Sequence, residues 1–473
     1  RPEAQSIFGI KNGIRVSAPK LIIQDELHLI SGPLGSMVGH YETLISELCT
    51  RNAPNGKVKP KIVASTATIS RAKEQCRALY ASSEDQVFQF PPSGLDAGDS
   101  FFAYEDKSQK GRKYVGIMAT GSSSDATTAI RLYSALLYAA KSIKTDSEVS
   151  RDAYWTNIAY FNSIRELGQA ATWIRTDIEH HLDVMYKRRF DDKRMTREEY
   201  RNYRRYIYRD EELTSRVTGD QLTSTLASLS QTYPPERDEN DRVVEYPIDI
   251  CLATNMISVG LDVPRLGLMT VNGQPKTTAE YIQATSRVGR NAASAPGIVF
   301  VLYRPGRPRD KSHYEHFKNY HSKIYSNVEP TSVTPFSSPV RSRAMHAIVV
   351  GMLRLQKDED FNFQKPRLPD FETIEDLREV LSTRVSQVDK YEQENTLNML
   401  NSILENWESW NPDKWTPDYD FQGFGDALPL IYPSGSQRKI SWGKRGFPAP
   451  TSMRNVDASC IVDVMQNRYI AEE

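Results

Sequence analysis

Short apolar runs alternate with helical stretches through the first two thirds of the chain, and this alternation constrains the fold more than any other feature. In residues 1–95, Leu21–Ile23 ends in acidic residues, Met37–Cys49 has helical periodicity, and Ile62–Ala64 ends in hydroxyl residues. Five more strand candidates follow: Tyr114–Met118, Ile158–Phe161, Ile248–Ala253, Leu268–Val271 and Ile298–Leu302. Strands that alternate with helices form parallel sheets. The sequence therefore predicts an α/β protein in which residues 1–95 and 96–330 each form a parallel-sheet domain.

Two other regions do not follow this alternation. Residues 172–245 form a polar segment far longer than the usual connection between a helix and a strand, so we predict an insertion that is mostly helical. The Pro- and Ser-rich stretch Pro330–Pro339 is typical of a linker. Beyond it we predict an α-rich C-terminal accessory domain, residues 331–473, with an apolar helix at Ala344–Leu355 and a helix near Glu375–Trp410.

Composition excludes several classes of protein. The 60 Lys and Arg balance 60 Asp and Glu, which argues against a wholly basic nucleic-acid coat but not against local basic patches. The four cysteines are far apart and include no CxxC pair, so the usual zinc spacing and a disulfide framework are both absent from the sequence. No apolar run reaches the roughly 18 to 20 residues of a membrane span, and Arg1–Glu3 does not begin a signal peptide. We expect a cytoplasmic protein with no membrane partner.

Acidic residues directly follow the first predicted strand. Asp25, Glu26 and His28 lie where that strand ends, and ligands bind at the carboxyl ends of strands in open α/β sheets. In a nucleotide hydrolase, an acid at this point holds Mg²⁺, and the next acid orients and deprotonates the attacking water. Asp25 fits the first role and Glu26 the second, and both are candidate metal ligands. The alternative is that the acidic pair only caps the next helix.

Hydroxyl residues follow the second predicted strand. Ser65 and Thr66 begin a cluster that ends at Thr68, and His28 could reach this cluster and relay the state of a bound nucleotide. The alternative is that Thr68 is the N-cap of a helix that starts near Ser70. Both interpretations can hold together.

A polar loop in the second domain has the composition of a phosphate site. It is the segment Thr254–Pro264, which directly follows a predicted strand. Its flexible Gly260 can bring backbone amides and the Thr254 hydroxyl close to phosphates.

Two arginines and a glutamine follow about 20 residues later. If the helix that begins before them continues, Gln283, Arg287 and Arg290 are spaced i, i+4 and i+7 and share one face. Two guanidinium groups aimed at a phosphate chain can stabilise the charge of phosphoryl transfer, and Gln can position nucleotide or water. The alternative is that both arginines are solvated surface charges.

These blocks, in this order, make the chain resemble the superfamily 2 helicases over residues 20–305. The matching segments are Asp25–His28 (motif II, the DEAH-type box), Ser65–Thr68 (motif III), Ile158–Ser163 (motif IV), Thr254–Pro264 (motif V) and Gln283–Arg290 (motif VI). Two positions depart from the family pattern. Leu27 stands in the acidic box, and Ser286 replaces the first glycine of motif VI.

The resemblance implies two RecA-like domains that hydrolyse ATP with Mg²⁺ between them and act on DNA, either single-stranded or duplex with an overhang. At the matching positions, it implies ATP contacts by Asp25, Glu26, Gly260, Asp262, Arg287 and Arg290. It implies further catalytic parts for His28 and Gln283. Nucleic-acid contacts are implied for Ser65, Thr66, Asn162, Ser163, Thr254, Asn255 and Ser258.

Three further segments resemble the helicase subunit of the bacterial DISARM anti-phage defence system. They are Gln24–Tyr41, Pro91–Leu95 and Pro450–Asp457. This resemblance implies a role in defence against phage and a second defence-system subunit as a partner. Related helicases that carry a cysteine-rich zinc domain at the C-terminus are the alternative, and the lack of paired cysteines weakens it.

The phosphate-binding loop Gly-x-x-x-x-Gly-Lys-Ser/Thr does not occur in the sequence. We therefore expect this chain to be the C-terminal part of a longer polypeptide, with an incomplete first RecA-like domain. The leading hypothesis is an ATP-dependent superfamily 2 DNA helicase or translocase. Its rival is a non-catalytic nucleic-acid-binding scaffold subunit that keeps a helicase fold, and a phosphate loop upstream would favour the motor.

The predicted insertion holds a basic and aromatic segment. Lys187–Arg209 contains ten Lys and Arg against four Asp and Glu, with Tyr and Phe interleaved. Such mixing suits phosphate contacts and base stacking, and the candidate contacts are Arg201, Arg204 and Arg205. The alternative is a helix with a solvated charged face and aromatic residues packed inward, and the sequence leaves this choice open.

Overall fold

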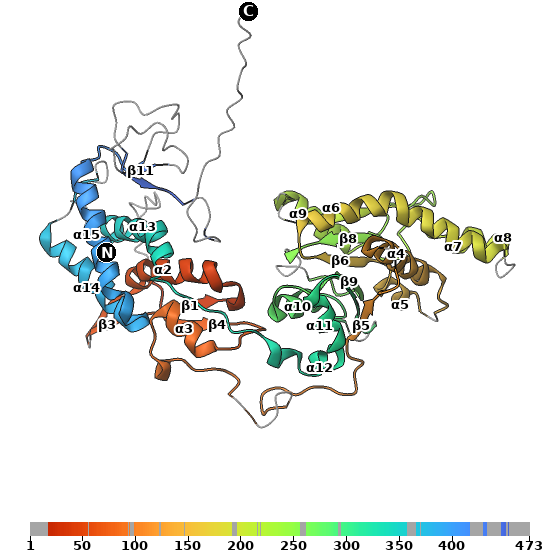
Figure 1. Cartoon of the computed structure of the whole chain (residues 1–473), viewed down its shortest axis with the longest axis horizontal. Helices are drawn as coiled ribbons and strands as arrows, with labels where there is room; N and C mark the ends of the chain where they lie inside the picture. Colours follow the sequence, from red (N-terminus) through yellow and green to blue (C-terminus); the bar gives the residue numbers. More distant parts are fainter. Residues whose placement is uncertain are drawn as a thin grey trace, which may run out of the picture. The chain divides into compact units, whose positions relative to one another are not determined.

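The computed structural model describes residues 18–54, 56–92, 94, 99–122, 124–145, 147–191, 196–214, 216–217, 219–255, 262–291, 295–356, 366–368, 370–416, 429–432, 446–450 and 453. Contacts divide the chain into two compact units, both drawn in Figure 1. Unit 1 comprises Arg1–Pro92 and Pro330–Glu473, and unit 2 comprises Ser93–Glu329. Among the described helices, none combines the length and the apolar composition that crossing a bilayer requires.

Unit 1 contains a pair of parallel strands, as the sequence predicts. β1 (Leu21–Gln24) pairs with β4 (Lys61–Ala64), in a register that sets Gln24 opposite Ala64. The other elements of this segment are η1 (Leu27–Leu29), α2 (Gly32–Cys49), β2 (Arg51–Ala53), β3 (Gly56–Val58), α3 (Ala72–Tyr80) and η2 (Glu84–Gln86). The two strands are joined through α2 and the β2–β3 hairpin, so the segment has the crossover form of a parallel sheet.

The C-terminal segment adds helices to unit 1. Its elements are α13 (Ser338–Gln356), α14 (Phe371–Val388), η6 (Lys390–Glu392), α15 (Gln393–Trp410), β11 (Ile431–Tyr432) and β12 (Phe447–Pro448). The helix predicted near Glu375–Trp410 is two helices, because the chain leaves the helical conformation at Asp389 and turns through η6. α13 packs against α2 and also contacts α14 and α15.

The stretch predicted as a linker packs against α2 instead. The Thr334 backbone N–H donates a hydrogen bond to the Ser36 hydroxyl over 2.9 Å, and Phe336 is only 1% exposed. Pro335 lies so close to Gly39 that a Cβ at Gly39 would be 2.8 Å from its Cγ. Pro335 and Phe336 are therefore buried in unit 1, whereas residues 330–332 are exposed.

Unit 2 contains a six-stranded parallel sheet with the order β5-β10-β9-β6-β8-β7. The strands are β5 (Lys113–Met118), β6 (Asn157–Phe161), β7 (Asp210–Leu213), β8 (Ile250–Ala253), β9 (Leu268–Asn272) and β10 (Ile298–Tyr303). All of the pairings are parallel, and each of the five strand candidates in this region is a strand of the sheet. The predicted fold class, α/β with parallel sheets, is confirmed.

Helices cover both faces of this sheet. They are α4 (Asp125–Ser142), α5 (Glu148–Ala153), α6 (Ile164–Trp173), the π-helical turn η3 (Ile174–Ile178), α7 (Glu179–Asp191), α8 (Arg197–Tyr203), α9 (Gly219–Leu229), α10 (Thr278–Thr285), α11 (Pro308–Glu315), α12 (Phe317–Ser322) and η5 (Ile324–Asn327). In β6, Ile158 and Tyr160 pack in a cluster with α10, whereas Ala159 and Phe161 pack in another with α4. Successive strand side chains point to opposite faces, so β6 is buried on both sides and has a largely apolar sequence.

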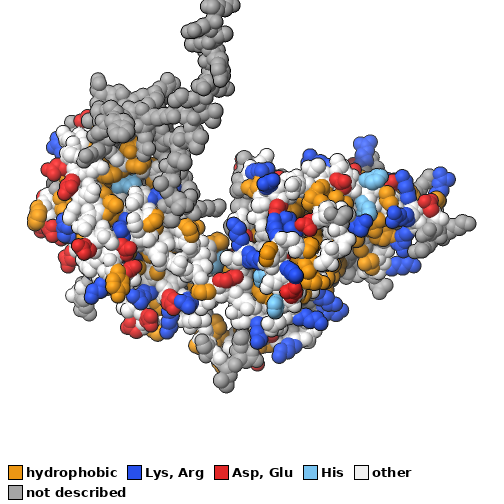
Figure 2. Space-filling view, in the orientation of Figure 1, with side chains coloured by type: hydrophobic (Ala, Val, Ile, Leu, Met, Phe, Trp, Pro, Cys, Tyr) orange, Lys and Arg blue, Asp and Glu red, His pale blue; other side chains and the backbone are white. Residues whose placement is uncertain are grey.

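The predicted insertion is not wholly helical. It contains α7, α8 and α9, but it also supplies β7, which pairs with β8 at the edge of the sheet. Three of the four β7 residues are acidic, which conceals this strand from a search for apolar runs. Figure 2 shows Lys and Arg side chains gathered over α7 and α8.

Candidate functional site

The acidic residues after β1 and the hydroxyl residues after β4 lie side by side. Because β1 and β4 are parallel and in register, the residues that follow them leave the sheet at the same edge. The Ser65 hydroxyl donates a hydrogen bond to Oδ1 of Asp25. The backbone N–H of Glu26 donates to the same oxygen over 2.8 Å. The structure therefore brings together predicted residues that are 40 positions apart in the sequence.

These hydrogen bonds hold the pKa of the Asp25 carboxyl below its usual value, and the Ser65 hydroxyl is the larger cause. Asp25 is exposed, so its carboxylate is both ionised at neutral pH and accessible. Mg²⁺ binds one or two carboxylates together with phosphate oxygens in nucleotide sites. The chemistry of Asp25 and Glu26 therefore fits the predicted metal ligands.

Glu26 has a left-handed backbone conformation, with φ 53° and ψ 47°. Side-chain-bearing residues seldom adopt this conformation, and such strain concentrates at functional sites. Glu26 Oε2 lies 3.3 Å from His28 Nδ1, and the same ring nitrogen lies 3.3 Å from Thr66 Oγ1. His28 thus reaches the hydroxyl cluster as the sequence predicts, while its relay role stays a prediction.

The N-cap predicted at Thr68 is wrong. The next helix, α3, begins at Ala72 after Arg71, so it starts too late for Thr68 to cap it. The Thr68 N–H contacts Thr66 Oγ1 over 3.3 Å instead. The cluster forms a local turn that holds Thr66 beside β4.

The single helical face predicted for Gln283, Arg287 and Arg290 is also wrong. α10 ends at Thr285, and Gly289 has a φ of +70°, which only glycine adopts readily. The backbone passes so close to Gly297 that a Cβ at Gly289 would be 2.3 Å from the Gly297 nitrogen. Gln283 therefore projects from the helix, whereas both arginines belong to the loop after it.

Motifs V and VI meet through an ion pair. Arg290 Nη1 lies 2.6 Å from Asp262 Oδ1, and Arg290 Nε donates to the Ser286 carbonyl over 3.3 Å. Arg287 is buried, with 6% of its surface exposed, while the Arg290 side chain is 32% exposed. Ser258 and Gly260 lie outside the described residues. Arg290 is the more accessible of the two arginines.

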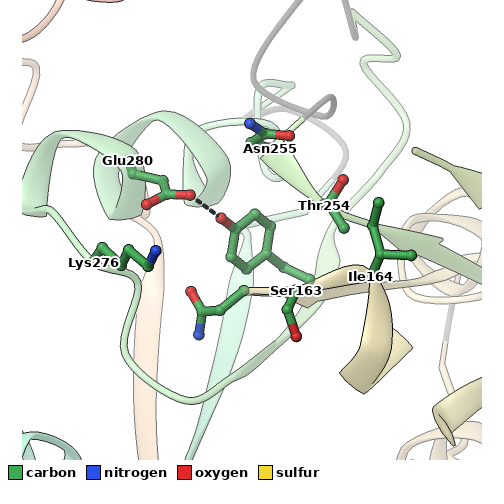
Figure 3. Close-up of a pocket in the computed structure, with 8 residues that line it drawn as sticks. Ser163, Ile164, Thr254, Asn255, Lys276 and Glu280 are labelled. Atoms are coloured by element: carbon green, nitrogen blue, oxygen red, sulfur yellow. Dashed lines mark hydrogen bonds between the residues drawn. The ribbon is translucent and has the colours of Figure 1, made fainter. Parts of the chain in front are cut away.

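A pocket of about 320 Å³ lies at the carboxyl ends of β6 and β8, which are neighbours in the sheet (Figure 3). It brings together four predicted nucleic-acid residues, namely Asn162, Ser163, Thr254 and Asn255. The remaining lining residues are Tyr160, which lies in the predicted motif IV, and Ile164, Lys276 and Glu280, which the sequence did not single out. The polar segment after the strand Leu268–Val271 is the signal that could have pointed to Lys276, because all parallel strands end at the same edge.

Asn162 and Ser163 shape this pocket as well as line it. The Asn162 side-chain amide donates to the carbonyls of Asn272 and Gly273 over 3.1 and 3.2 Å. Ser163 is the N-cap of α6 and accepts a hydrogen bond from the Glu166 N–H over 3.3 Å. A helix N-terminus favours anionic groups, and the exposed Lys276 adds a positive charge. These donors suit a phosphate, and the Glu280 carboxylate, which also lines the pocket, accepts a hydrogen bond from the Tyr160 hydroxyl over 2.5 Å.

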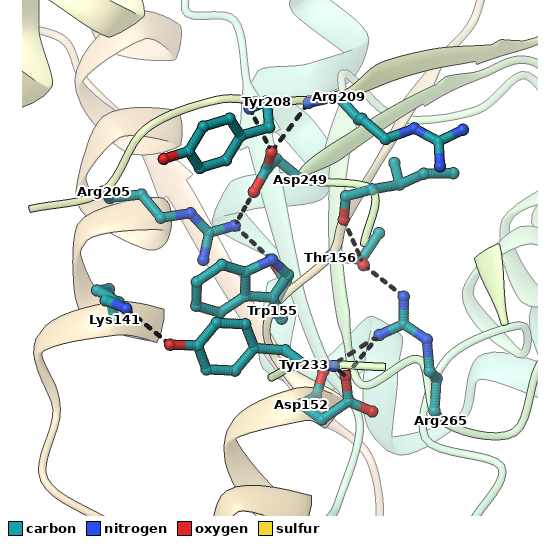
Figure 4. Close-up of polar contacts among 11 residues, drawn as sticks. Lys141, Asp152, Trp155, Thr156, Arg205, Tyr208, Arg209, Tyr233, Asp249 and Arg265 are labelled. Carbon is teal, nitrogen blue, oxygen red and sulfur yellow. Dashed lines mark hydrogen bonds and ion pairs between the residues drawn. The ribbon is translucent and has the colours of Figure 1, made fainter. Parts of the chain in front are cut away.

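Arg205, predicted to contact nucleic acid, is buried in the core of unit 2 (Figure 4). Its Nη2 lies 2.8 Å from Asp249 Oδ1, and both side chains are 1% exposed. Its guanidinium stacks 3.4 Å from the ring centre of Trp155. The second Asp249 oxygen accepts hydrogen bonds from the N–H groups of Tyr208 and Arg209. The assignment of Arg205 to nucleic acid is wrong, because its guanidinium is buried and pairs with Asp249. This ion pair holds the segment that leads into β7 against the rest of unit 2.

The other residues of the basic segment are less enclosed. Arg204 pairs with Asp183 over 2.8 Å and lies 4.7 Å from the ring centre of Tyr206. Tyr186 is fully buried, so part of the aromatic set packs inward, as the alternative interpretation holds. The side chain of Arg201 lies outside the described residues.

Comparison with known proteins agrees with the motifs. Residues 222–292 match the family model of the helicase conserved C-terminal domain. The chain is 39% identical over 462 residues to the DISARM protein DrmA of Bacillus paralicheniformis, a match covering 96% of this chain and 39% of that protein. It is 27% identical over 100 residues to the nucleolar RNA helicase 2-B of Xenopus laevis, covering 19% and 12% of the two chains.

A crystal structure of the DUF1998 helicase MrfA bound to DNA is similar with a TM-score of 0.44 and 14% identity, covering 76% of this chain and 40% of that one. The chain spans about two fifths of the length of DrmA. The predicted resemblance to the superfamily 2 helicases and to the DISARM helicase subunit is confirmed.

Replacing Arg205 with Ala should lower the free energy of unfolding by about 3–5 kcal/mol, because it leaves Asp249 buried without its ion-pair partner. Arg204→Ala is the matched control. Its ion pair is partly exposed, so we expect a loss of about 0–1 kcal/mol. Urea denaturation followed by circular dichroism measures both. An equally small loss in the two variants would return Arg205 to the candidate surface contacts.

Ser65→Ala should raise the pKa of Asp25, because it removes the larger of the two bonds that stabilise the carboxylate. A pH titration of the ¹³C-aspartate-labelled protein, followed by NMR, measures the Asp25 pKa. Thr66→Ala is the control, since Thr66 contacts His28 rather than Asp25. An Asp25 titration that is the same in Ser65→Ala and wild type would mean that the hydroxyl does not hold the carboxylate in solution.

Proposed function

We propose that this relative of the superfamily 2 helicases is part of an ATP-dependent DNA helicase or translocase that acts in bacterial anti-phage defence. The match to the DISARM protein DrmA supports the defence role. We propose DNA, single-stranded or duplex with an overhang, as its track and a second defence-system subunit as its partner. We also propose the domain division predicted from the sequence, with cytoplasmic location.

The observation that carries the proposal is the contact between the acidic box and the hydroxyl cluster in unit 1. Ser65 donates to Asp25 and lowers the pKa of its carboxyl, and His28 contacts both Glu26 and Thr66. A helix cap needs neither the strained Glu26 backbone nor a second strand end beside it. These features do suit a site that must position charged groups around a phosphate chain.

The acidic residues have separate parts in this proposal. Asp25 would hold Mg²⁺, which when bound neutralises phosphate charge in phosphoryl transfer. Glu26 would orient and deprotonate the attacking water. Arg287 and Arg290 would stabilise the charge on the transferred phosphoryl group, and Gln283 would position nucleotide or water.

The pocket of unit 2 would hold the DNA backbone. Ser163 with the N-terminus of α6, Thr254, Asn255 and the Lys276 ammonium offer donors and positive charge to a phosphate. Such contacts fix position without reading sequence, which is what a motor that moves along any DNA needs.

Glu26→Gln in the full-length protein should nearly abolish DNA-stimulated ATP hydrolysis and preserve ATP binding, because the amide cannot deprotonate water. Glu74→Gln, an exposed residue of the same unit, is the control and should leave turnover unchanged. A coupled ATPase assay and a nucleotide-binding titration provide the two readouts. Comparable turnover in Glu26→Gln and wild type would favour the non-catalytic scaffold.

Arg290→Ala should lower ATP turnover by about 10³ to 10⁵, the contribution of arginine fingers in phosphoryl transfer, and leave DNA affinity without ATP unchanged. Asp262→Asn tests the other side of the pair, because it breaks the ion pair but keeps the guanidinium. We expect Asp262→Asn to retain more turnover than Arg290→Ala. Turnover of Arg290→Ala above roughly a tenth of wild type, a barrier change under about 1.4 kcal/mol, would reduce Arg290 to a structural partner of Asp262.

A further inference from the structure

A basic segment that the motif search did not single out follows the last strand of unit 2. Residues 304–323 contain six Lys and Arg against two acidic residues, Asp310 and Glu315. Four cations gather around the start of α11, and we name them the α11 basic surface: Lys276, Arg307, Arg309 and Lys311. All four are exposed. Figure 2 shows Lys and Arg side chains over the part of unit 2 where Figure 1 places α11.

The nearby acidic residues neutralise only part of the charge on this surface. Asp310 is 2% exposed and accepts hydrogen bonds from the N–H groups of Gln274 and Arg304, over 3.1 and 3.0 Å, so its charge is used inside the fold. Glu315 forms an ion pair with Lys311 at 3.9 Å, but both side chains are more than half exposed, so solvent screens this pair. An excess of positive charge therefore remains at the surface.

A single carboxylate from α6 serves two of the arginines. Glu166 Oε1 lies 2.8 Å from Arg304 Nη1 and 2.5 Å from Arg307 Nη2. Within the part of the chain that the structure describes, no carboxylate lies within 4.0 Å of Lys276 or Arg309. Two guanidinium groups on one carboxylate leave a net positive charge beside α11.

The α11 basic surface is continuous with the pocket at the ends of β6 and β8. Arg309 donates from Nη2 to the carbonyl of Lys276 over 2.6 Å, and Lys276 lines the pocket. On the other side, a Cβ at Gly273 would be 3.5 Å from Asn162 Nδ2 and 3.6 Å from Arg307 Nη1. Arg307 therefore lies next to Asn162, another lining residue, and the positive charge extends from the pocket onto α11.

We propose that the α11 basic surface binds the phosphates of single-stranded DNA adjacent to the phosphate held in the pocket. This inference rests on the proposed function and specifies where the strand runs on unit 2. The competing interpretation is a solvated helix end. Arg307 and Lys311 favour the DNA contact, because their side chains are 46% and 59% exposed and both residues lie at the first turn of α11, where the Lys311 N–H donates to the Arg307 carbonyl over 3.0 Å.

The test is the salt dependence of DNA binding by the full-length protein. Arg307→Gln with Lys311→Gln removes two charges without stranding a buried acid, since Arg304 still pairs with Glu166. Each lost phosphate contact to a single strand flattens the slope of log affinity against log salt by about 0.7, so we expect a change of about 1.4. Fluorescence anisotropy with a labelled oligonucleotide from 50 to 200 mM salt, a range in which such contacts dominate, gives the slope.

Arg237→Gln with Arg242→Gln is the matched control. Both residues are exposed, lie in unit 2 ahead of β8 and remove the same charge. A slope for the α11 variant that equals the control's would overturn the proposal, provided that wild type hydrolyses ATP with DNA stimulation. Wild-type protein with no DNA-stimulated hydrolysis would instead overturn the proposed function itself. Circular dichroism confirms that each variant is folded.

Discussion

Parallel pairing of neighbouring strands is the constraint on which both parts of the candidate site depend. The register of β1 with β4 sets Gln24 opposite Ala64, so Asp25 and Ser65 must leave the sheet together. The pairing of β6 with β8 acts in the same way on residues that follow Phe161 and Ala253. Local sequence has no other means of bringing side chains 40 or about 90 positions apart into contact. A one-residue slip in strand register would therefore separate the functional residues and would also turn every side chain of the slipped strand to the opposite face of the sheet.

The loops beside the candidate site contain backbone conformations that strands and helices do not have. Glu26 takes up a left-handed conformation directly after β1, and Gly289 does so after α10. At Gly289 the reason is steric, because the backbone of Gly297 leaves no room for a Cβ. Glu26 has a Cβ, so its left-handed backbone is strained. This conformation places the Glu26 carboxylate beside His28. Both bends turn the chain away from the direction of the preceding strand or helix and so set the positions of the charged side chains beside them.

The sequence was sufficient for the sheet and for the strand-end residues, because buried parallel strands have apolar runs and polar residues stand where they end. It failed where a residue's environment is set by distant partners. β7 escaped detection because its acids are matched by cations such as Arg175 and Arg209. The helical face predicted through Arg290 was wrong, since periodicity does not reveal the close approach of Gly289 to Gly297, eight residues later. Lys276 was recognised as a pocket residue only from the structure, which shows that β9 ends at the same edge of the sheet as β6 and β8.

Arginines show this limit most clearly, because the same side chain serves as core or surface according to its carboxylate partners. Arg205 has Asp249 to itself in a buried setting, and its charge attaches β7 to the sheet. Around α11, Arg304 and Arg307 both pair with the same Glu166 oxygen. Positive charge therefore remains that no described carboxylate balances. A count of basic residues ranks the insertion first, with ten against six. The number of unmatched charges, rather than the number of charges, decides where a phosphate chain gains most by binding.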